Sequence, residues 1–124
     1  MAKILLVEDN EMNRDMLSRR LQRRGYDVVI AIDGEEGVSM ARSDAPDLIL
    51  MDITLPDVDG FEALLRLREL HETKTTPVVA LSGNAMPSDI KKALDAGFAN
   101  YLTKPLNIDE LYQVIANILG TTPQ

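Results

Sequence analysis

The chain has 124 residues, of which 45% are hydrophobic and 27% charged, a size and composition typical of one globular domain. A formal net charge of −7 argues against bulk attraction to nucleic acid or to an anionic membrane as the main function. With no cysteine and one histidine, His71, the sequence excludes thiolate chemistry and histidine-cluster metal sites, so only hard, oxygen-ligated metals fit. We expect one domain over residues 1–120, a short polar tail over 121–124, and a cytoplasmic protein, because the apolar run before Glu8 is too short for a signal peptide or a membrane span.

Five short runs rich in Ile, Leu and Val predict β-strands. The first, third and fourth are apolar enough for strands buried on both faces, which is typical of a parallel sheet. The runs are Ile4 to Val7, Val28 to Ile32, Leu48 to Met51, Pro77 to Leu81, and Tyr101 to Leu102.

Stretches with helical spacing of apolar residues separate these runs. Met12, Met16, Leu17 and Leu21 mark the first, and Ile108, Leu111, Ile115 and Leu119 mark the last, which Asn107 can cap and Gly120 can end. Strict alternation of five strands and five helices predicts an α/β fold, a doubly wound (βα)5 parallel sheet with the flavodoxin-like strand order 2-1-3-4-5. Ligands are then expected at the carboxyl ends of the first and third strands.

Three carboxylates fall at that position. Glu8 and Asp9 follow the first strand, and Asp52 ends the third. Such a cluster repels itself unless a cation neutralises it, and oxygen ligands suit Mg²⁺, with Mn²⁺ as a substitute. The alternative is that these are ordinary solvated residues or helix caps at strand ends.

A hydroxyl and an ammonium group follow the fourth and fifth strands at the same edge of the sheet. They belong to Ser82, in Ser82-Gly83-Asn84, and to Lys104, in Thr103-Lys104-Pro105. Together with an aspartate nucleophile and a metal, these groups are what phosphoryl transfer requires, since that reaction depends on positioning and charge neutralisation.

The motifs in this order resemble the response-regulator receiver domain, which is CheY-like. They cover essentially the whole chain: Glu8-Asp9, Asp52, Pro56 and Gly60, Ser82, and Lys104-Pro105. The stretch from Val7 to Arg14 also resembles stand-alone regulators and the receivers of hybrid histidine kinases.

The resemblance implies a role for each acidic residue. Asp52 is the implied phospho-acceptor. Asp9 and Asp52 are expected to ligate Mg²⁺ directly, Glu8 through water, and Thr54 through its backbone carbonyl.

It also implies that Ser82 and Lys104 each contact a phosphoryl oxygen, so that Asp52, Lys104 and Ser82 form the catalytic set. The Lys104-Pro105 peptide is expected to be cis. Tyr101 matches the aromatic switch position that the family couples to Ser82. The residues at Thr54 and Asn84 are expected to tune the lifetime of the phosphorylated form.

The function implied is that of a single-domain regulator in a two-component phosphorelay. Its phosphoryl donor is a phosphohistidine on a histidine kinase or a histidine phosphotransfer protein, and its output is contact with a downstream protein. It is not an enzyme in the ordinary sense, because it catalyses only its own phosphorylation and dephosphorylation. A monomer is expected, and dimerisation on phosphorylation stays open.

Three other functions share parts of this pattern. A haloacid-dehalogenase-like aspartyl phosphatase needs a second Asp where Thr54 stands. A flavin or dinucleotide module needs a glycine-rich loop in place of Glu8-Asp9-Asn10. A degenerate receiver that binds partners without phosphorylation is disfavoured by the complete acidic set.

The first predicted helix is basic in an acidic protein. Its arginines are Arg14, Arg19, Arg20, Arg23 and Arg24. A solvated face or a docking face for a protein partner is favoured over nucleic-acid binding, because exposed aromatic residues are not interleaved with the arginines and the net charge is −7. In the receiver family this helix commonly meets the kinase.

Overall fold

A computed structural model describes residues 2–55, 57–84 and 86–120. Strands and helices alternate along this part of the chain, as the spacing of apolar residues predicts. They are β1 (Lys3–Val7), α1 (Glu11–Arg23), β2 (Asp27–Ala31), α2 (Gly34–Asp44), β3 (Leu48–Asp52), α3 (Gly60–Glu69), β4 (Val78–Ser82), α4 (Pro87–Ala96), β5 (Asn100–Thr103) and α5 (Ile108–Leu119).

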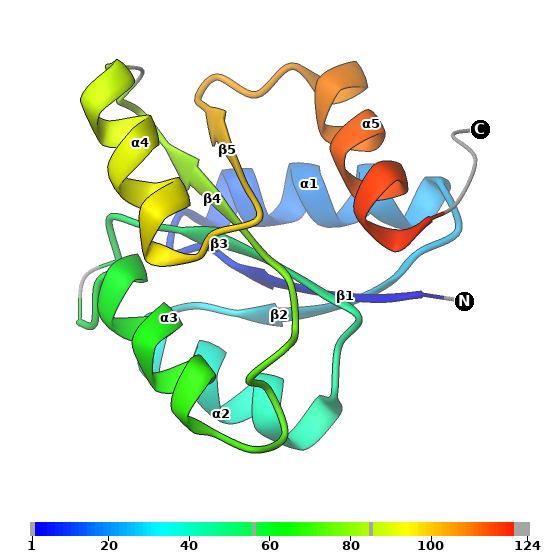
Figure 1. The fold of residues 1–124 in the computed structure, drawn as a ribbon. Helices are drawn as coiled ribbons and strands as arrows, with labels where there is room; N and C mark the ends of the chain where they lie inside the picture. The colour runs from blue at the N-terminus through cyan, green and yellow to red at the C-terminus, as the bar shows by residue number, and fades with distance from the viewer. Residues whose placement is uncertain (1, 56, 85, 121–124) are drawn as a thin grey trace.

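The five strands form one parallel sheet in the order β2-β1-β3-β4-β5 (Figure 1). This confirms the predicted fold class and strand order. Val7 at the end of β1 pairs with Met51 of β3, and the next residue of β3, Asp52, pairs with Leu81 of β4. The chain reverses its direction of strand addition between β1 and β3, where parallel α/β sheets bind ligands.

The predicted strand bounds differ from the observed ones by about one residue at several ends. The second strand begins at Asp27 and ends at Ala31, because the backbone N–H of Ile32 donates to the Glu36 side chain. The fourth runs from Val78 to Ser82 and begins after Pro77, whose carbonyl still accepts a hydrogen bond from Ile49. Asp52 and Ser82 are therefore the terminal residues of their strands.

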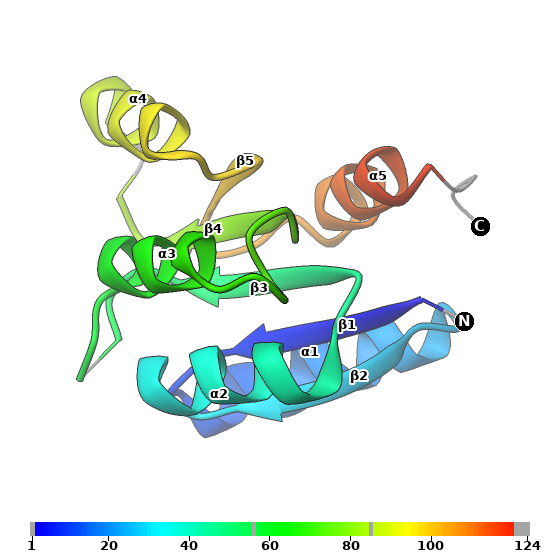
Figure 2. The same cartoon turned by 60° about the horizontal axis from the view of Figure 1, so that its bottom comes forward.

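Two apolar cores lie on opposite faces of the sheet, beneath the helices that Figure 2 shows on either side of it. Alternate residues of β1 point to opposite sides: Ile4 and Leu6 pack under α1 and α5, whereas Leu5 and Val7 pack under α2, α3 and α4. All four are fully buried. Helices on both faces explain why β1, β3 and β4 are almost continuously apolar.

Side-chain caps start four of the helices. Asn10, Asp33, Asp59 and Asn107 each accept a hydrogen bond from the backbone N–H three residues later. Gly120 ends α5 with a φ of 72°, as predicted. No helix in the described ranges is long and apolar enough to cross a lipid bilayer.

The loop between β3 and α3 is held close to its surroundings. A Cβ atom on Gly60 would lie 2.6 Å from the Cα of Ile53, so only glycine fits this approach. The Asp57 carboxylate accepts hydrogen bonds of 2.9 Å from the backbone N–H groups of Gly34 and Glu35 at the start of α2. The loop that follows Asp52 is thus tied to a neighbouring helix.

Candidate functional site

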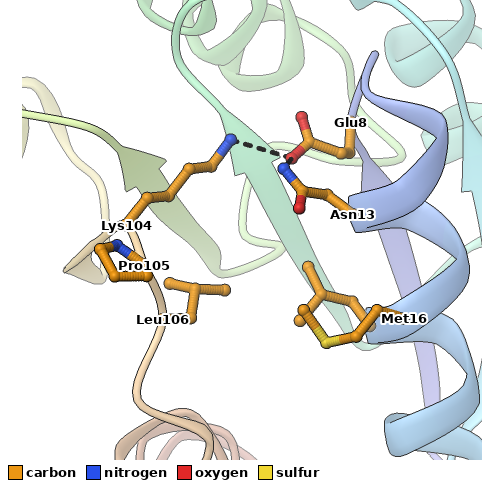
Figure 3. Close-up of a pocket in the computed structure, with 7 residues that line it drawn as sticks. Glu8, Asn13, Met16, Lys104, Pro105 and Leu106 are labelled. Carbon is orange, nitrogen blue, oxygen red and sulfur yellow. Dashed lines mark hydrogen bonds and ion pairs between the residues drawn. The ribbon is translucent and has the colours of Figure 1, made fainter.

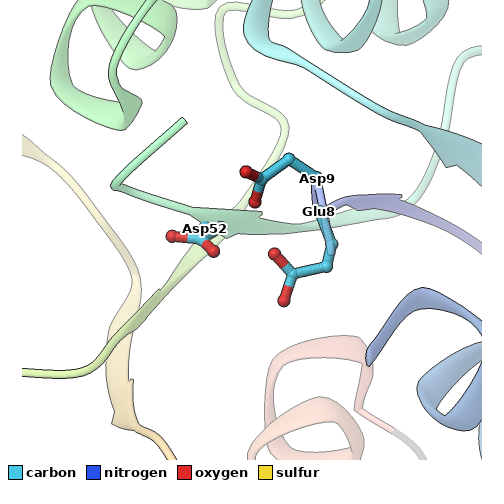
Figure 4. A group of neighbouring side chains, drawn as sticks. All are labelled: Glu8, Asp9 and Asp52. Carbon is cyan, nitrogen blue, oxygen red and sulfur yellow. The ribbon is translucent and has the colours of Figure 1, made fainter. Parts of the chain in front are cut away.

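The three predicted carboxylates meet at the carboxyl ends of β1 and β3 (Figure 4). One oxygen from each of Glu8, Asp9 and Asp52 lies within 4.8 Å of the others. The site is asymmetric, because Glu8 is 0% and Asp52 2% exposed, whereas Asp9 faces solvent. The sequence prediction that these residues form one cluster is confirmed.

Lys104, which follows β5, reaches into this cluster. Its Nζ lies 2.6 Å from Oδ2 of Asp52 and 2.9 Å from Oε1 of Glu8. Two nearly unexposed carboxylates therefore share a single ammonium group, so removing Lys104 would leave both carboxylates without a positive charge in direct contact. Lys104 is the residue that joins the fifth strand to the first and third.

Thr54 fixes the other oxygen of Asp52. Both its backbone N–H and its hydroxyl donate to Oδ1 of Asp52 over 2.8 Å. The sequence analysis expected Thr54 to supply a backbone carbonyl to the cation and to tune the lifetime of the phosphorylated form, and these two hydrogen bonds to Asp52 are an addition. Asp52 is consequently held at both carboxylate oxygens, by Thr54 on one side and by Lys104 on the other.

The two buried carboxylates have pKa values shifted in opposite directions. Burial, reinforced by the nearby Asp52, raises the pKa of Glu8 from 4.5 to about 7 although Lys104 opposes the rise. Burial also disfavours ionisation of Asp52, but its interactions with Glu8 and with the Lys104 ammonium group, and then the hydrogen bonds from Thr54, lower its pKa to about 2. Asp52 is therefore ionised at neutral pH.

The pKa of Lys104 is also shifted by its contacts with the two carboxylates. Burial disfavours the charged form of Lys104, but its hydrogen bonds with Asp52 and Glu8 outweigh this and raise its pKa. The ammonium group stays charged and supplies the one positive charge in direct contact with the cluster among the described side chains.

The donor set fits a divalent cation. Three carboxylates face one ammonium group, so the cluster keeps an excess of negative charge when all are ionised. Oε2 of Glu8 is buried and has no hydrogen-bond partner among the described residues, and a buried polar atom without a partner calls for an ion or a water molecule. Oxygen-only ligands are those that Mg²⁺ prefers.

The start of α1 contributes contacts that the sequence reasoning did not assign. The side-chain amide of Asn13 donates to Oε1 of Glu8 over 3.2 Å. The guanidinium of Arg14 donates to the backbone carbonyls of Glu8 and Asp9 over 3.1 and 2.9 Å. The signal in the sequence was the position of both residues one turn after the acidic pair, where a helix side chain can reach back.

A cavity of about 480 Å³ adjoins the cluster, between α1 and the segment after β5 (Figure 3). Glu8, Asn13 and Lys104 form its polar end, and Met16 and Leu106 are among its apolar lining. Of the three carboxylates, Glu8 therefore borders a partly apolar hollow, whereas Asp9 faces solvent.

The predicted switch residues Ser82 and Tyr101 both form hydrogen bonds with the backbone of Asn84. The N–H of Asn84 donates to Oγ of Ser82 over 3.1 Å, and the hydroxyl of Tyr101 donates to the carbonyl of Asn84 over 2.7 Å. Ser82 is fully buried and Tyr101 is 8% exposed. The tyrosine ring already occupies a buried position, so its movement in response to Ser82 stays a prediction.

The arginines of α1 are less available than the sequence suggested. Arg14 is engaged with the loop carbonyls described above, and Arg24 lies just beyond α1 with its guanidinium 4.0 Å from the ring centre of Tyr112. Arg19 pairs with Asp15 over 3.2 Å at the surface. The arginines that stay exposed are Arg19, Arg20 and Arg23, and the docking of a protein partner on this face stays a prediction.

The Lys104-Pro105 peptide bond is cis, as expected. His71 is exposed just after α3. Pro56 of the proposed family motif lies outside the described residues.

Comparison with known proteins supports one family. Residues 4–116 match the response regulator receiver domain. The polar-differentiation response regulator DivK of Brucella anthropi is 34% identical over 117 residues, which cover 94% of this chain and 95% of DivK. The hybrid signal transduction histidine kinase I of Dictyostelium discoideum is 39% identical over 120 residues. The alignment covers 91% of this chain but only 7% of that kinase.

Solved structures agree. The receiver domain of the sensor histidine kinase PA1611 from Pseudomonas aeruginosa, which has a magnesium ion coordinated in its active-site cleft, is 36% identical with a TM-score of 0.88, covering 97% of this chain and 98% of that one. A chain in the co-crystal structure of the Saccharomyces cerevisiae histidine phosphotransfer protein Ypd1 and the Ssk1 receiver domain is 28% identical with a TM-score of 0.90. The alignment covers 99% of this chain and 92% of that one. With its sheet topology, its acidic cluster and its match over most of its length, this chain belongs to the response regulator receiver domain family of two-component signalling.

Proposed function

We propose that Asp52 accepts a phosphoryl group from a phosphohistidine, in a reaction that depends on a divalent cation, and that the phosphorylated domain then changes its protein contacts. The observation that carries this proposal is the Lys104 ammonium group shared by Asp52 and Glu8. It keeps a buried aspartate ionised beside an unpartnered carboxylate oxygen of Glu8. An ionised, desolvated carboxylate is a competent nucleophile.

The two oxygens of Asp52 have separate tasks in this proposal. Oδ1 is held by the two donors of Thr54, so Oδ2 is the oxygen whose lone pair becomes available when Lys104 turns to a phosphoryl oxygen. Oδ2 forms a bond to phosphorus while the bond from phosphorus to the imidazole nitrogen of the donor breaks, and the imidazole keeps the electron pair. In this proposal, Ser82 binds another phosphoryl oxygen.

The residues proposed to hold the cation are Asp9 and Asp52 directly, Glu8 through water, and the backbone carbonyl of Thr54. A bound Mg²⁺, or Mn²⁺ as a substitute, would neutralise the negative charge that the carboxylates and the phosphoryl group bring together. The metal site of the PA1611 receiver is the reason to prefer Mg²⁺.

The proposed switch runs through Asn84. If the Ser82 hydroxyl turns to a phosphoryl oxygen, it no longer accepts the hydrogen bond from the Asn84 N–H. The same residue's carbonyl binds the Tyr101 hydroxyl, so a shift of this backbone unit is transmitted to β5. A bond formed only in the phosphorylated state supplies the free-energy difference that a switch requires.

The proposed phosphoryl donor is a histidine kinase or a histidine phosphotransfer protein, as in the Ypd1 and Ssk1 pair. The output is a downstream protein target rather than nucleic acid, given the net charge of −7. The monomeric state and the cytoplasmic location expected from the sequence stay predictions.

The test is incorporation of phosphate from acetyl phosphate, followed by phosphate-affinity gel electrophoresis. The parent protein should be labelled with Mg²⁺ and unlabelled in excess chelator, because the carboxylates repel the phosphoryl group without a cation. Asp52→Asn should remain unlabelled, whereas the matched variant Asp95→Asn, on the exposed surface of α4, should behave like the parent. Labelling of Asp52→Asn would give the nucleophile to another residue, and absence of labelling in the parent would favour a degenerate receiver.

A further inference from the structure

The two oxygens of the buried Glu8 carboxylate have different surroundings. Oε1 accepts hydrogen bonds from Nζ of Lys104 over 2.9 Å and from Nδ2 of Asn13 over 3.2 Å. Oε2 has no partner among the described residues. The orientation of this carboxylate therefore depends on two donors, which reach it from opposite sides of the cavity (Figure 3).

These two donors are not equally permanent. Lys104 also lies 2.6 Å from Oδ2 of Asp52, and in the proposed function it turns to a phosphoryl oxygen during transfer. Asn13 is then the one side-chain donor left to Glu8 among the described residues. Without it, a carboxylate with 0% exposure would have no protein group to hold it in place while the cation is bound.

Asn13 is itself held firmly. Its backbone N–H donates to the Asn10 side chain over 2.9 Å, which caps α1. The next residue, Arg14, ties the carbonyls of Glu8 and Asp9 to the same helical turn. The amide of Asn13 is therefore presented from a fixed point, and the loop that carries the acidic pair is fixed relative to it.

An amide is chemically suited to this task. It donates a hydrogen bond without adding positive charge, so it orients the Glu8 carboxylate and leaves its negative charge available to a cation. A lysine or arginine at the same place would neutralise Glu8 and repel the cation. Groups that orient metal ligands by hydrogen bonding commonly affect metal affinity strongly.

We propose that Asn13 is a positioning residue of the metal site: its side-chain amide holds the Glu8 carboxylate toward the cation and keeps it there when Lys104 turns to the phosphoryl group. This inference rests on the proposed function. Asn13 is not among the residues proposed to hold the cation or the phosphoryl group, and its role is exerted through Glu8.

The test is an NMR-detected Mg²⁺ titration of the full chain, with unfolding temperature measured alongside. Asn13→Ala should weaken Mg²⁺ binding by about tenfold, the lower end of the range for such groups, while unfolding stays cooperative, because the higher helix propensity of alanine offsets part of the lost hydrogen bond to Glu8. Gln22→Ala is the matched control, since it removes an amide from the exposed far end of the same helix. It should leave the Mg²⁺ affinity unchanged.

A double-mutant cycle identifies the route of the effect. In a Glu8→Gln background, the neutral side chain contributes little to cation binding, so adding Asn13→Ala should change the affinity by less than about twofold. If Asn13→Ala still weakened Mg²⁺ binding about tenfold in the Glu8→Gln background, the inference would be overturned. Equal Mg²⁺ affinities of the parent and Asn13→Ala would also overturn it. If the parent itself binds no Mg²⁺, both the proposed function and the inference fail. If the parent binds Mg²⁺ and Asn13→Ala binds it equally well, the inference alone fails.

Discussion

Replacing Glu8 with glutamine should stabilise the metal-free protein while weakening its site. Glu8 is fully buried beside Asp52, and burial raises its pKa from 4.5 to about 7. Because the folded pKa lies above the unfolded value, the carboxyl group favours folding most below pH 4.5. That contribution is lost as the pH rises through about 7, where the buried group must ionise.

The size of the effect follows from the shift. At about 1.4 kcal/mol per pKa unit, the shift corresponds to about 3 kcal/mol of unfolding free energy above neutral pH. Glutamine has nearly the same shape and never ionises, and it can still accept hydrogen bonds from Lys104 and Asn13. We therefore expect Glu8→Gln to be more stable than the parent by up to about 3 kcal/mol at about pH 8 in chelator, and by less than about 1 kcal/mol at about pH 5.

Urea unfolding at both pH values, with chelator and with Mg²⁺, measures this difference. Glu69→Gln on the exposed surface of α3 is the matched control and should show no such pH dependence. Mg²⁺ should reduce the advantage of Glu8→Gln, because a ligand that binds the native state stabilises the parent more. If Glu8→Gln were no more stable than the parent at about pH 8 in chelator, the assignment of Glu8 as a buried acid with a raised pKa would be refuted. The same conclusion would follow if its stability gain over the parent were equal at both pH values.

Other consequences can be measured separately. Tyr101→Phe keeps the ring but loses the hydrogen bond to the Asn84 carbonyl, so urea unfolding should show a loss of about 1 kcal/mol; an unchanged stability would mean that this bond contributes nothing. Desolvation disfavours the charged form of the exposed Asp57, but hydrogen bonds from backbone N–H groups outweigh it and lower the pKa of Asp57 to about 2. The parent should therefore lose stability as the pH falls from 3.8 toward 2, and Asp57→Asn should lack this part of the acid dependence in thermal unfolding. Charge reversal of Arg20 and Arg23 should slow phosphotransfer from a histidine phosphotransfer protein and leave labelling by acetyl phosphate intact; equal loss with both donors would argue against docking there.

The fold could be predicted from the sequence because its signals are local. Apolar runs such as 48–51 are too continuous for a strand exposed on one face, and the helical spacing between the runs requires crossover connections. Parallel strands place their carboxyl ends at one edge, so the meeting of Asp52 with Glu8 follows from position in the chain. Errors were confined to strand ends, where competing hydrogen bonds such as that of Ile32 with Glu36 decide the last pair.

The pairings inside the site depended on the tertiary structure. Lys104 lies 96 residues from Glu8 and 52 from Asp52 in the sequence, and no local pattern states that one ammonium group serves both. The same holds for the engagement of Arg14 and Arg24, which removed them from the basic face predicted for α1. These contacts depend on side-chain rotamers and on the separation of elements that are distant in sequence.

The sequence by itself determined which chemical groups arrive at the edge of the sheet: three carboxylates, a hydroxyl and an ammonium group, each placed by the end of a strand. Only the tertiary structure decided how they share hydrogen bonds, which of them are buried, and that the Asn13 side chain donates a hydrogen bond to Glu8. The physical reason is range. Hydrophobic periodicity acts over a few residues and sets the elements, whereas burial and charge pairing arise only when elements far apart in the chain are packed within a few ångströms of one another.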